Sequence, residues 1–375
     1  MLDAAAESGR GLNNFDVLRL LAAASVVFAH SFLVVGDTAP IPEWAGVEYG
    51  QLGLIVFFSI SGFLVARSWD YDPKLFTFAM KRILRLFPAL IVVLLLTALL
   101  GLFLTNLGAT AYLQDPRTKL YVLSNAVLQR DDFLPGLFES NTLKDINRSL
   151  WTIPLEFKAY ILIAVLGLLG FFRRTPVAMA LIGILTALLL TGTVRNWVPY
   201  ANNATAFLAD IQIPKTYVQQ ARDGALFMVL QPFAAFVIAA MLYRLRKWVP
   251  LSWWLLALGL AAWLLVATIG DSSQNTRVVA TWVVPFIVLV LAYRTHAWFS
   301  LPSRMGDYSY GIYLFAFPIQ QTIVHIIDPE SGWVVMLITM PIVLGLAMLS
   351  WHFVEAPSLT LKQRLAPLVD SESTS

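Results

Sequence analysis

The 375-residue chain contains no cysteine and few charged residues. Without cysteine, the chain has no disulfide bond, no thiolate nucleophile and no thiolate metal ligand. Lys, Arg, Asp and Glu account for only 13% of the residues, whereas soluble globular proteins contain about 25%. Hydrophobic residues make up 58%, with 12 Trp and 24 Phe, and the mean hydropathy is +0.71. This composition excludes an ordinary soluble protein and indicates that most of the chain lies in lipid.

Ten apolar stretches approach the length of a membrane-spanning helix, which takes about 20 mostly apolar residues. They cover residues 15–35, 50–68, 86–107, 150–170, 177–195, 224–243, 251–269, 278–294, 308–327 and 333–353. We therefore predict an all-α polytopic membrane protein with about ten transmembrane helices in one bundle. Residues 15–357 form this transmembrane domain, between an N-terminal segment, residues 1–14, and a tail, residues 358–375. No Ala-x-Ala-like cleavage site follows the first stretch, so we expect a retained helix and not a signal peptide.

The distribution of Lys and Arg predicts the orientation of the bundle, because cytoplasmic loops carry an excess of these residues. With both termini in the cytoplasm, the short outer loops 36–49, 270–277 and 328–332 contain a single basic residue, Arg277. The inner loops then contain clusters of basic residues. We therefore predict cytoplasmic N- and C-terminal segments. The net charge of +3 is a signal of membrane topology and not of nucleic-acid binding.

Two long outer loops, residues 108–149 and 196–223, are the only sizeable extramembrane parts of the predicted topology. They contain turn-forming residues and aromatic residues. One interpretation is that a carbohydrate or a lipid-linked acceptor meets the protein there, and the other is that these loops are mere connectors.

The first helix carries two ionisable residues, Arg19 and His30, with a stretch between them in which serine is the only polar residue. They are eleven residues apart, which is within about 20° of three full turns, so both side chains lie on one face, about 16 Å apart along the axis. Ionisable groups in lipid usually face a cavity or a partner. Alternatively, Arg19 reaches the inner headgroups and His30 forms a structural hydrogen bond between helices. A cation at the inner end and a proton acceptor farther out suit a long donor such as acyl-coenzyme A (acyl-CoA), whose phosphates stay at the cytoplasmic side.

Further candidates for a donor site lie in the second and third helices. Arg82 and Arg85 are neighbours on one helical face, at the cytoplasmic end, and guanidinium groups can bind phosphate in a bidentate manner. Alternatively, they only anchor the helix in the headgroups. Ser59, Ser61 and Gly62 form a patch of small residues near the middle of the membrane. This patch leaves room for a pantetheine arm, but small residues also allow helices to approach closely.

Glu156, in the sequence SLWTIPLEFKAY, is the candidate partner of His30. It lies about six residues into the fourth helix, roughly 9 Å deep from the outer side, and His30 is roughly 7–8 Å deep. The similar depths predict that the carboxylate orients the imidazole and raises its basicity. The alternative is an ion pair of Glu156 with Lys158 or a loop arginine, although Lys158 points to another side of the helix. His325, near the outer end of the ninth helix, is the rival to His30 as a base.

Arg19 and His30 with ten residues between them, within FDVLRLLAAASVVFAH, resemble the Arg-x10-His signature of the acyltransferase 3 family of integral membrane O-acyltransferases. FFSISGFL, KRILRLFP, SLWTIPLEFKAY, SYGIYLFAFPI and HFVEAP resemble later blocks of that family in the same order, so the resemblance extends from about Phe15 to Pro357. It implies ten helices and transfer of an acyl group, commonly acetyl, from cytoplasmic acyl-CoA to a hydroxyl of an extracytoplasmic acceptor. Usual acceptors are surface polysaccharides, exopolysaccharides and lipopolysaccharide O-antigens, and some members modify small molecules such as macrolides.

The resemblance also implies roles for particular residues. His30 is the implied catalytic base, Arg19, Arg82 and Arg85 serve the CoA side, and Glu156 matches the acidic position after the Trp. The implied setting is a multi-pass protein of the bacterial cytoplasmic (inner) membrane, with acetyl-CoA as donor, a glycan or glycolipid acceptor, membrane lipid as its surroundings, and neither a metal nor a nucleic-acid partner.

The chain departs from the family pattern at Ala316, where many members carry a histidine, and we expect no hydrolase domain of the SGNH type after the last helix. In the predicted mechanism, His30 removes the proton of the acceptor hydroxyl, which attacks the thioester directly; an acyl-histidine intermediate is a second possibility. A transporter or flippase is the alternative function, because intramembrane Arg, His and Glu also mark substrate and proton paths. Internal repeats and paired broken helices, which transporters often show, are not evident in the sequence. A non-catalytic partner of a glycan-assembly complex is a third interpretation.

Overall fold

The computed structural model describes residues 14–36, 41–170, 215–269, 273–294 and 306–361, together with Leu2, Val177, Ala180 and Ile184. Almost all of the predicted stretch 177–195 lies outside these described residues. One of the four histidines of the chain, His296, also lies outside them. Side chains of α10 are described from Met228 onward.

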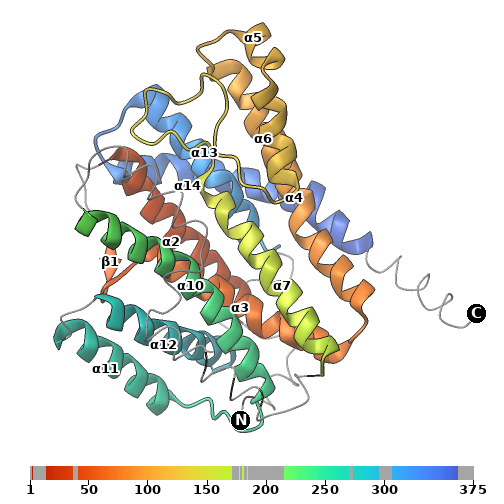
Figure 1. The fold of residues 1–375 in the computed structure, drawn as a ribbon, viewed down its shortest axis with the longest axis vertical. Coiled ribbons are helices and arrows are strands. Elements are labelled where there is room, and N and C mark those ends of the chain that lie inside the picture. The colour runs from red at the N-terminus through yellow and green to blue at the C-terminus, as the bar shows by residue number, and fades with distance from the viewer. Residues whose placement is uncertain are drawn as a thin grey trace, which may run out of the picture.

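The described chain is a bundle of α-helices (Figure 1). The helices are α2 (Phe15–Val35), α3 (Tyr49–Tyr71), α4 (Leu75–Leu104), α5 (Ala109–Gln114), α6 (Pro116–Ala126), α7 (Thr152–Leu168), α10 (Lys215–Arg244), α11 (Trp253–Ile269), α12 (Ser273–Arg294), α13 (Ser309–Ile327) and α14 (Gly332–Ser350). A short 3-10 turn, η1 (Arg148–Trp151), precedes α7, and a π-helical turn, η5 (Trp351–Glu355), follows α14. Figure 1 shows α11 and α12 together on one flank of the bundle, and α6 packs against α4.

Seven of the described helical segments are long and apolar enough to cross a membrane. Two further apolar segments, Met228–Arg244 and Trp253–Ile269, are shorter. Together these segments correspond to every predicted stretch except 177–195. The prediction of an all-α polytopic membrane protein is therefore confirmed. We call the end of the bundle at which α2 begins the inner end, in keeping with the predicted orientation, and the opposite end the outer end.

Helix α4 begins at Leu75, earlier than the predicted start at residue 86. Its 30 residues make it about 45 Å long, which exceeds the hydrocarbon core of about 30 Å. The helix therefore extends beyond the lipid, and the basic residues Arg82 and Arg85 belong to it. Charge ends the apolar stretch but not the helix, because Lys and Arg are good helix formers. Helix α10 likewise begins within the predicted outer loop 196–223, at Lys215.

A short hairpin between α2 and α3 was not predicted from the sequence. Strands β1 (Glu43–Trp44) and β2 (Val47–Glu48) pair in antiparallel fashion. The two turn residues, Ala45 and Gly46, have positive φ values of 47° and 72°, as required by the tight turns that match the twist of a hairpin. The Trp263 Nε1 of α11 donates a hydrogen bond to the Ala45 carbonyl at 3.1 Å, and this bond fixes the hairpin to the bundle.

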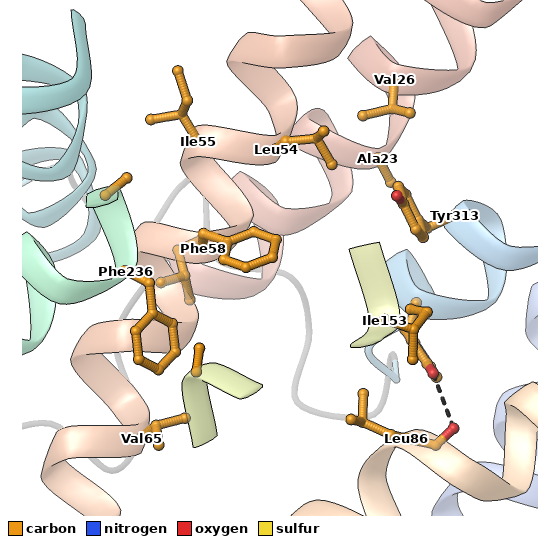
Figure 2. Close-up of a cluster of buried hydrophobic side chains, with 14 of the residues drawn as sticks. Ala23, Val26, Leu54, Ile55, Phe58, Val65, Leu86, Ile153, Phe236 and Tyr313 are labelled. Atoms are coloured by element: carbon orange, nitrogen blue, oxygen red, sulfur yellow. Dashed lines mark hydrogen bonds between the residues drawn. The ribbon is translucent and has the colours of Figure 1, made fainter. Parts of the chain in front are cut away.

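Helix α3 lies in the middle of the core, in contact with α2, α7, α10 and α12. Figure 2 shows Ile55, Phe58 and Val65 along α3, with Phe236 of α10 beside them. A Cβ atom at Gly62 would lie 2.1 Å from the carbonyl oxygen of Phe236. The close crossing of α3 and α10 therefore requires glycine at this position, as is common where membrane helices pack.

The outer loop between α6 and α7 descends along α13 into the bundle. Asn141 donates to the carbonyl of Gln321 at 2.9 Å, and the Gln321 side chain donates to the carbonyl of Asp145 at 2.6 Å. Farther in, Asn147 donates to the carbonyl of Leu314 at 2.9 Å. Gln321 and Leu314 are about 10 Å apart along α13. Irregular backbone is tolerated at this depth because it is buried in protein and hydrogen-bonded there, and α7 begins inside the bundle as a result.

Candidate active site

A cavity of about 320 Å³ lies among α3, α4, α7 and α13. On α3 its lining runs from Leu54 to Ser68, a span of about 21 Å along the helix axis. Figure 2 shows Leu86 and Ile153, two of its apolar lining residues, and its dashed line marks the hydrogen bond from the Tyr310 hydroxyl to the Leu86 carbonyl, 2.9 Å long. The polar lining consists of Arg19, Ser61, Ser68, Lys81, Arg82, Arg85, Thr152, Glu156, Tyr160, Ser309, Tyr310 and Tyr313.

At the inner end of the cavity, Asp307 binds two of the predicted arginines. Its Oδ2 atom lies 3.1 Å from Arg19 and 2.5 Å from Arg85, and the Ser309 hydroxyl donates to its Oδ1 atom. Burial by itself would raise the pKa of Asp307, but the charges of Arg85 and Arg19 and the hydrogen bonds from Ser309 lower this pKa to about 2. Asp307 is therefore ionised at neutral pH, and it joins α2 and α4 to the start of α13.

Glu355 is a second buried carboxylate near the inner end. Its side chain is 2% exposed, its Oε2 atom lies 3.5 Å from Arg85, and the Ser350 hydroxyl donates to Oε1 at 3.0 Å. Glu355 ends the π-helical turn η5, and turns of this kind are frequent at functional sites. Arg85 thus has two carboxylate partners, so a phosphate group would have to compete with them for this guanidinium.

Glu156 lies in the cavity wall next to Ser61 and Tyr160. Its Oε1 atom accepts a hydrogen bond from the Ser61 hydroxyl at 3.1 Å and another from the Tyr160 hydroxyl. The guanidinium of Arg82 lies over the rings of Phe78 and Tyr160, 5.5 Å and 5.4 Å from their centroids. The buried Nε atom of Arg82 has no hydrogen-bond partner among the residues that the structure describes. Glu156 and Arg82 therefore form one polar cluster around Tyr160.

His30 lies farther out, on the face of α2 that contacts α13. Its ring packs edge to face on Phe317 with the centroids 5.2 Å apart, and its buried Nδ1 atom has no hydrogen-bond partner within the described ranges. Arg19 contacts Asp307, which lies just before α13, the helix that also carries Phe317. Arg19 and His30 therefore both face α13, and the prediction that they share one face of α2 is confirmed. Phe317 is one turn beyond Tyr313, which places His30 about 6 Å outside the outer end of the cavity.

The structure does not bring Glu156 and His30 together, which corrects the predicted pairing. Thr152 is hydrogen-bonded to Tyr313 at 2.7 Å, and α7 continues inward from Thr152 by one more turn to Glu156. Glu156 is therefore roughly 12 Å farther in than His30, too far for a hydrogen bond. The depth predicted from the sequence assumed that α7 starts at the outer surface, whereas the segment 141–152 descends along α13 before α7 begins.

Two residues of the predicted small-residue patch, Ser59 and Gly62, are not among the described residues that line the cavity. The Ser59 hydroxyl donates to the Ile55 carbonyl within α3 at 2.6 Å, and Gly62 packs on Phe236. The helix-packing alternative considered for this patch therefore fits both residues. Ser61 is the member of the patch that faces the cavity.

The other described histidines have contacts of a different kind. His325 Nδ1 lies 3.4 Å from the Ser140 hydroxyl, and its ring contacts Phe138 of the same outer loop. His352 Nε2 lies 3.4 Å from the Tyr308 hydroxyl near the inner end. His325, the rival base, therefore holds the outer loop. Within the described part of the chain, no three His, Asp or Glu side chains are grouped closely enough to hold a metal ion.

Sequence reasoning assigned no role to Asp307 or to three tyrosines of the cavity, Tyr160, Tyr310 and Tyr313. The sequence nevertheless contains a signal for each of them. Tyr160 is four residues after Glu156, hence on the same face of α7. Tyr310 and Tyr313 belong to the block SYGIYLFAFPI, and Asp307 lies two residues before its first residue, Ser309. The sequence identifies these blocks, but the packing of the helices determines which of their polar residues line the cavity.

The fold and the site define a multi-pass helical membrane protein with a polar cavity toward one end and a histidine beyond the other end of that cavity. A family model described as an acyltransferase domain matches residues 12–352. The chain belongs to this family, the acyltransferase 3 family, as the sequence blocks predicted. The protein is therefore a membrane acyltransferase.

Two relatives extend over nearly the whole chain. The O-acetyl transferase of Shigella phage Sf6 is 28% identical over 349 residues, which cover 93% of this chain and 96% of that protein. Nodulation protein 10 of Rhizobium leguminosarum bv. viciae is 30% identical over 376 residues, which cover 94% of this chain and 95% of that protein. No solved structure matches the chain.

Proposed function

We propose that this acyltransferase transfers an acetyl group from cytoplasmic acetyl-CoA to a hydroxyl of a glycan or glycolipid at the outer face of the bacterial cytoplasmic membrane. Surface polysaccharide, exopolysaccharide and O-antigen are the acceptor classes that fit. The name of the phage relative, O-acetyl transferase, supports acetyl transfer to oxygen. Membership of an acyltransferase family favours this function over a transporter or flippase.

The observation that carries the proposal is the position of the cavity relative to His30. Basic side chains line the inner end of the cavity, and the hydroxyls of Thr152 and Tyr313 lie at its outer end. His30 is about one helical turn beyond these hydroxyls. A donor that enters from the inner end brings its thioester toward His30, while an acceptor approaches from the outer side.

In the proposed step, His30 acts as a general base. An imidazole nitrogen accepts the proton of the acceptor hydroxyl while the hydroxyl oxygen attacks the thioester carbon. A C–O bond forms and the C–S bond breaks, and the electron pair of the C–S bond leaves with the sulfur as CoA thiolate. The imidazolium then gives its proton to the thiolate. The products are the acetyl ester and CoA, and the step balances without a further reactant.

Transfer of labelled acetyl groups tests this proposal. Membrane vesicles from bacteria that produce the protein are supplied with acetyl-CoA labelled in the acetyl group, and alkali-labile label in the envelope glycans is measured. General-base catalysis contributes roughly 10²–10⁴-fold, so His30→Ala is expected to lose at least about a hundredfold of the activity, and His325→Ala less than about twofold. His325→Ala is the matched control because this histidine is also near the outer end but contacts the loop.

Each part of the proposal has a result that contradicts it. Full transfer by His30→Ala would show that His30 is not the base. Stabilisation of the purified wild-type protein against heat by excess acetyl-CoA tests the donor separately from the acceptor, because a ligand that binds the folded state raises its apparent stability. Absence of this stabilisation at millimolar acetyl-CoA would remove acyl-CoA as the donor.

A further inference from the structure

Four basic side chains line the cavity, and a carboxylate lies close to each of them. These are Arg19, Lys81, Arg82 and Arg85. Asp307 pairs with Arg19 and Arg85, which also contact Asp16 and Glu355, respectively. Asp72 pairs with Lys81 at 2.9 Å, and Glu156 lies in the wall itself, next to Arg82 around Tyr160. A buried site of this kind favours an uncharged polar occupant, because unpaired charge is costly to bury. The pantetheine arm of CoA is such an occupant, and its two amide groups each present one donor and one acceptor.

Two polar side chains of the cavity, Glu156 and Arg82, each have an atom available to a ligand, one to accept and one to donate a hydrogen bond. A carboxylate only accepts hydrogen bonds and a guanidinium only donates them. Both hydrogen bonds to Glu156 from described residues end on its Oε1 atom, so Oε2 remains for a donor. The Nε of Arg82 is buried without an acceptor among the described residues. The two side chains are neighbours, because Tyr160 donates to Glu156 and lies under the Arg82 guanidinium.

We propose that Glu156 and Arg82 hold one amide of the pantetheine arm, with Glu156 accepting from the amide N–H and Arg82 donating to the amide carbonyl. This inference rests on the proposed function, because it takes acyl-CoA as the donor. It also gives Glu156 a different role from the one predicted from the sequence. Glu156 binds the donor about two turns inside His30 and does not orient the imidazole. The charged nucleotide then remains outside the cavity, at the inner end.

Competition binding with fragments of CoA tests the inference. Labelled acetyl-CoA is bound to the purified full-length protein, and it is displaced either by pantetheine, which lacks the nucleotide, or by adenosine bisphosphate, which lacks the arm. Loss of one partner from a buried amide should weaken pantetheine binding about tenfold or more in Glu156→Ala and in Arg82→Met. Glu156→Gln keeps an acceptor oxygen and is expected to lose less. Adenosine bisphosphate should bind equally to all variants.

The controls separate amide binding from general damage. Lys158→Met changes an exposed residue of α7, and Arg117→Met an exposed residue of α6, and both should bind pantetheine as the wild type does. If Glu156→Ala does not fold, Arg82→Met alone tests whether the pair holds the amide. This variant removes no hydrogen bond from Nε to another described residue, because that atom has no such partner.

The inference and the proposed function fail in different ways. Wild-type protein that does not bind acetyl-CoA contradicts the proposed donor. Wild-type protein that binds acetyl-CoA but is not displaced by millimolar pantetheine overturns the inference alone. The inference is also overturned if folded Glu156→Ala or Arg82→Met protein binds pantetheine as tightly as the wild type, or if these variants lose affinity for adenosine bisphosphate to the same extent.

Discussion

Replacement of Asp307 by Ala should destabilise the protein substantially, because this carboxylate neutralises two arginines. Removal of one partner of a buried ion pair usually costs about 3–5 kcal/mol, since it leaves an uncompensated charge. The Asp307 side chain is 10% exposed, and Arg19 and Arg85 are each 22% exposed at distances of 3.1 Å and 2.5 Å. We expect the lower end of the range, about 3 kcal/mol, because solvent reaches part of the arginines and Glu355 still faces Arg85.

The same residue predicts a loss of stability in acid. The ordinary pKa of an aspartate, 3.8, is lowered in the folded protein to about 2. A lowered pKa means that the folded state favours the ionised form, so the stabilisation by Asp307 is fully present above its ordinary pKa. It is lost as the pH falls from about 4 toward about 2. In Asp307→Ala this part of the acid dependence should be absent.

Unfolding of the purified protein in detergent, by heat and by denaturant, measures both effects. The matched control is Asp72→Ala, whose 24%-exposed carboxylate pairs with Lys81 and whose loss should cost no more than about 1 kcal/mol. Adding Arg19→Met to Asp307→Ala removes an arginine whose remaining carboxylate partner among the described residues is the 54%-exposed Asp16, at 3.4 Å. This second change should restore part of the lost stability. The reasoning is refuted if Asp307→Ala is as stable as Asp72→Ala, or if the double variant loses the sum of the two single effects.

Two further substitutions test the packing around the site. Gly62→Ala should cost about 1–3 kcal/mol in unfolding measurements, because overpacking forces α3 away from the Phe236 backbone; Gly345→Ala, where an added Cβ would meet nothing within 4 Å, should be nearly neutral. Gln321→Leu should cost about 2 kcal/mol, because it leaves the partly buried carbonyls of Leu143 and Asp145 without their donor. It should also speed proteolysis within the outer loop, and unchanged cleavage there would contradict the role given to Gln321.

The fold was largely predictable because lipid imposes one strong requirement on the chain. Every spanning segment must be apolar and helical, so composition and stretch length predicted the apolar helices that the structure describes. The short helices α5 and α6, in the predicted outer loop 108–149, were not predicted. The errors fall where the requirement does not apply. Helix α4 continues inward past the predicted start at residue 86 as far as Leu75. The hairpin depends on the positive φ of Ala45 and Gly46, and α7 starts deep in the bundle. None of these features can be recognised from the hydropathy of the sequence.

The candidate site was only partly predictable because its contacts join residues far apart in the sequence. Helical periodicity was sufficient to place Arg19 and His30 on one face. It could not predict that Asp307 binds Arg19, since this contact depends on how α2 and α13 pack. The depth of Glu156 also depended on packing, because a polar loop can enter a membrane protein when another helix satisfies its backbone groups.

Helix α13 connects the parts of the proposed reaction without providing the base. Asp307 at its start binds the arginines of the inner end, Tyr313 lines the cavity, Phe317 packs on His30 and Gln321 holds the outer loop. These four positions follow one another along about 20 Å of chain. Under the proposed function, only the uncharged arm and the acetyl group travel along this length, which avoids burial of the charged nucleotide. The position of α13 therefore decides, under the proposed function, whether the thioester, the base and the outer loop meet.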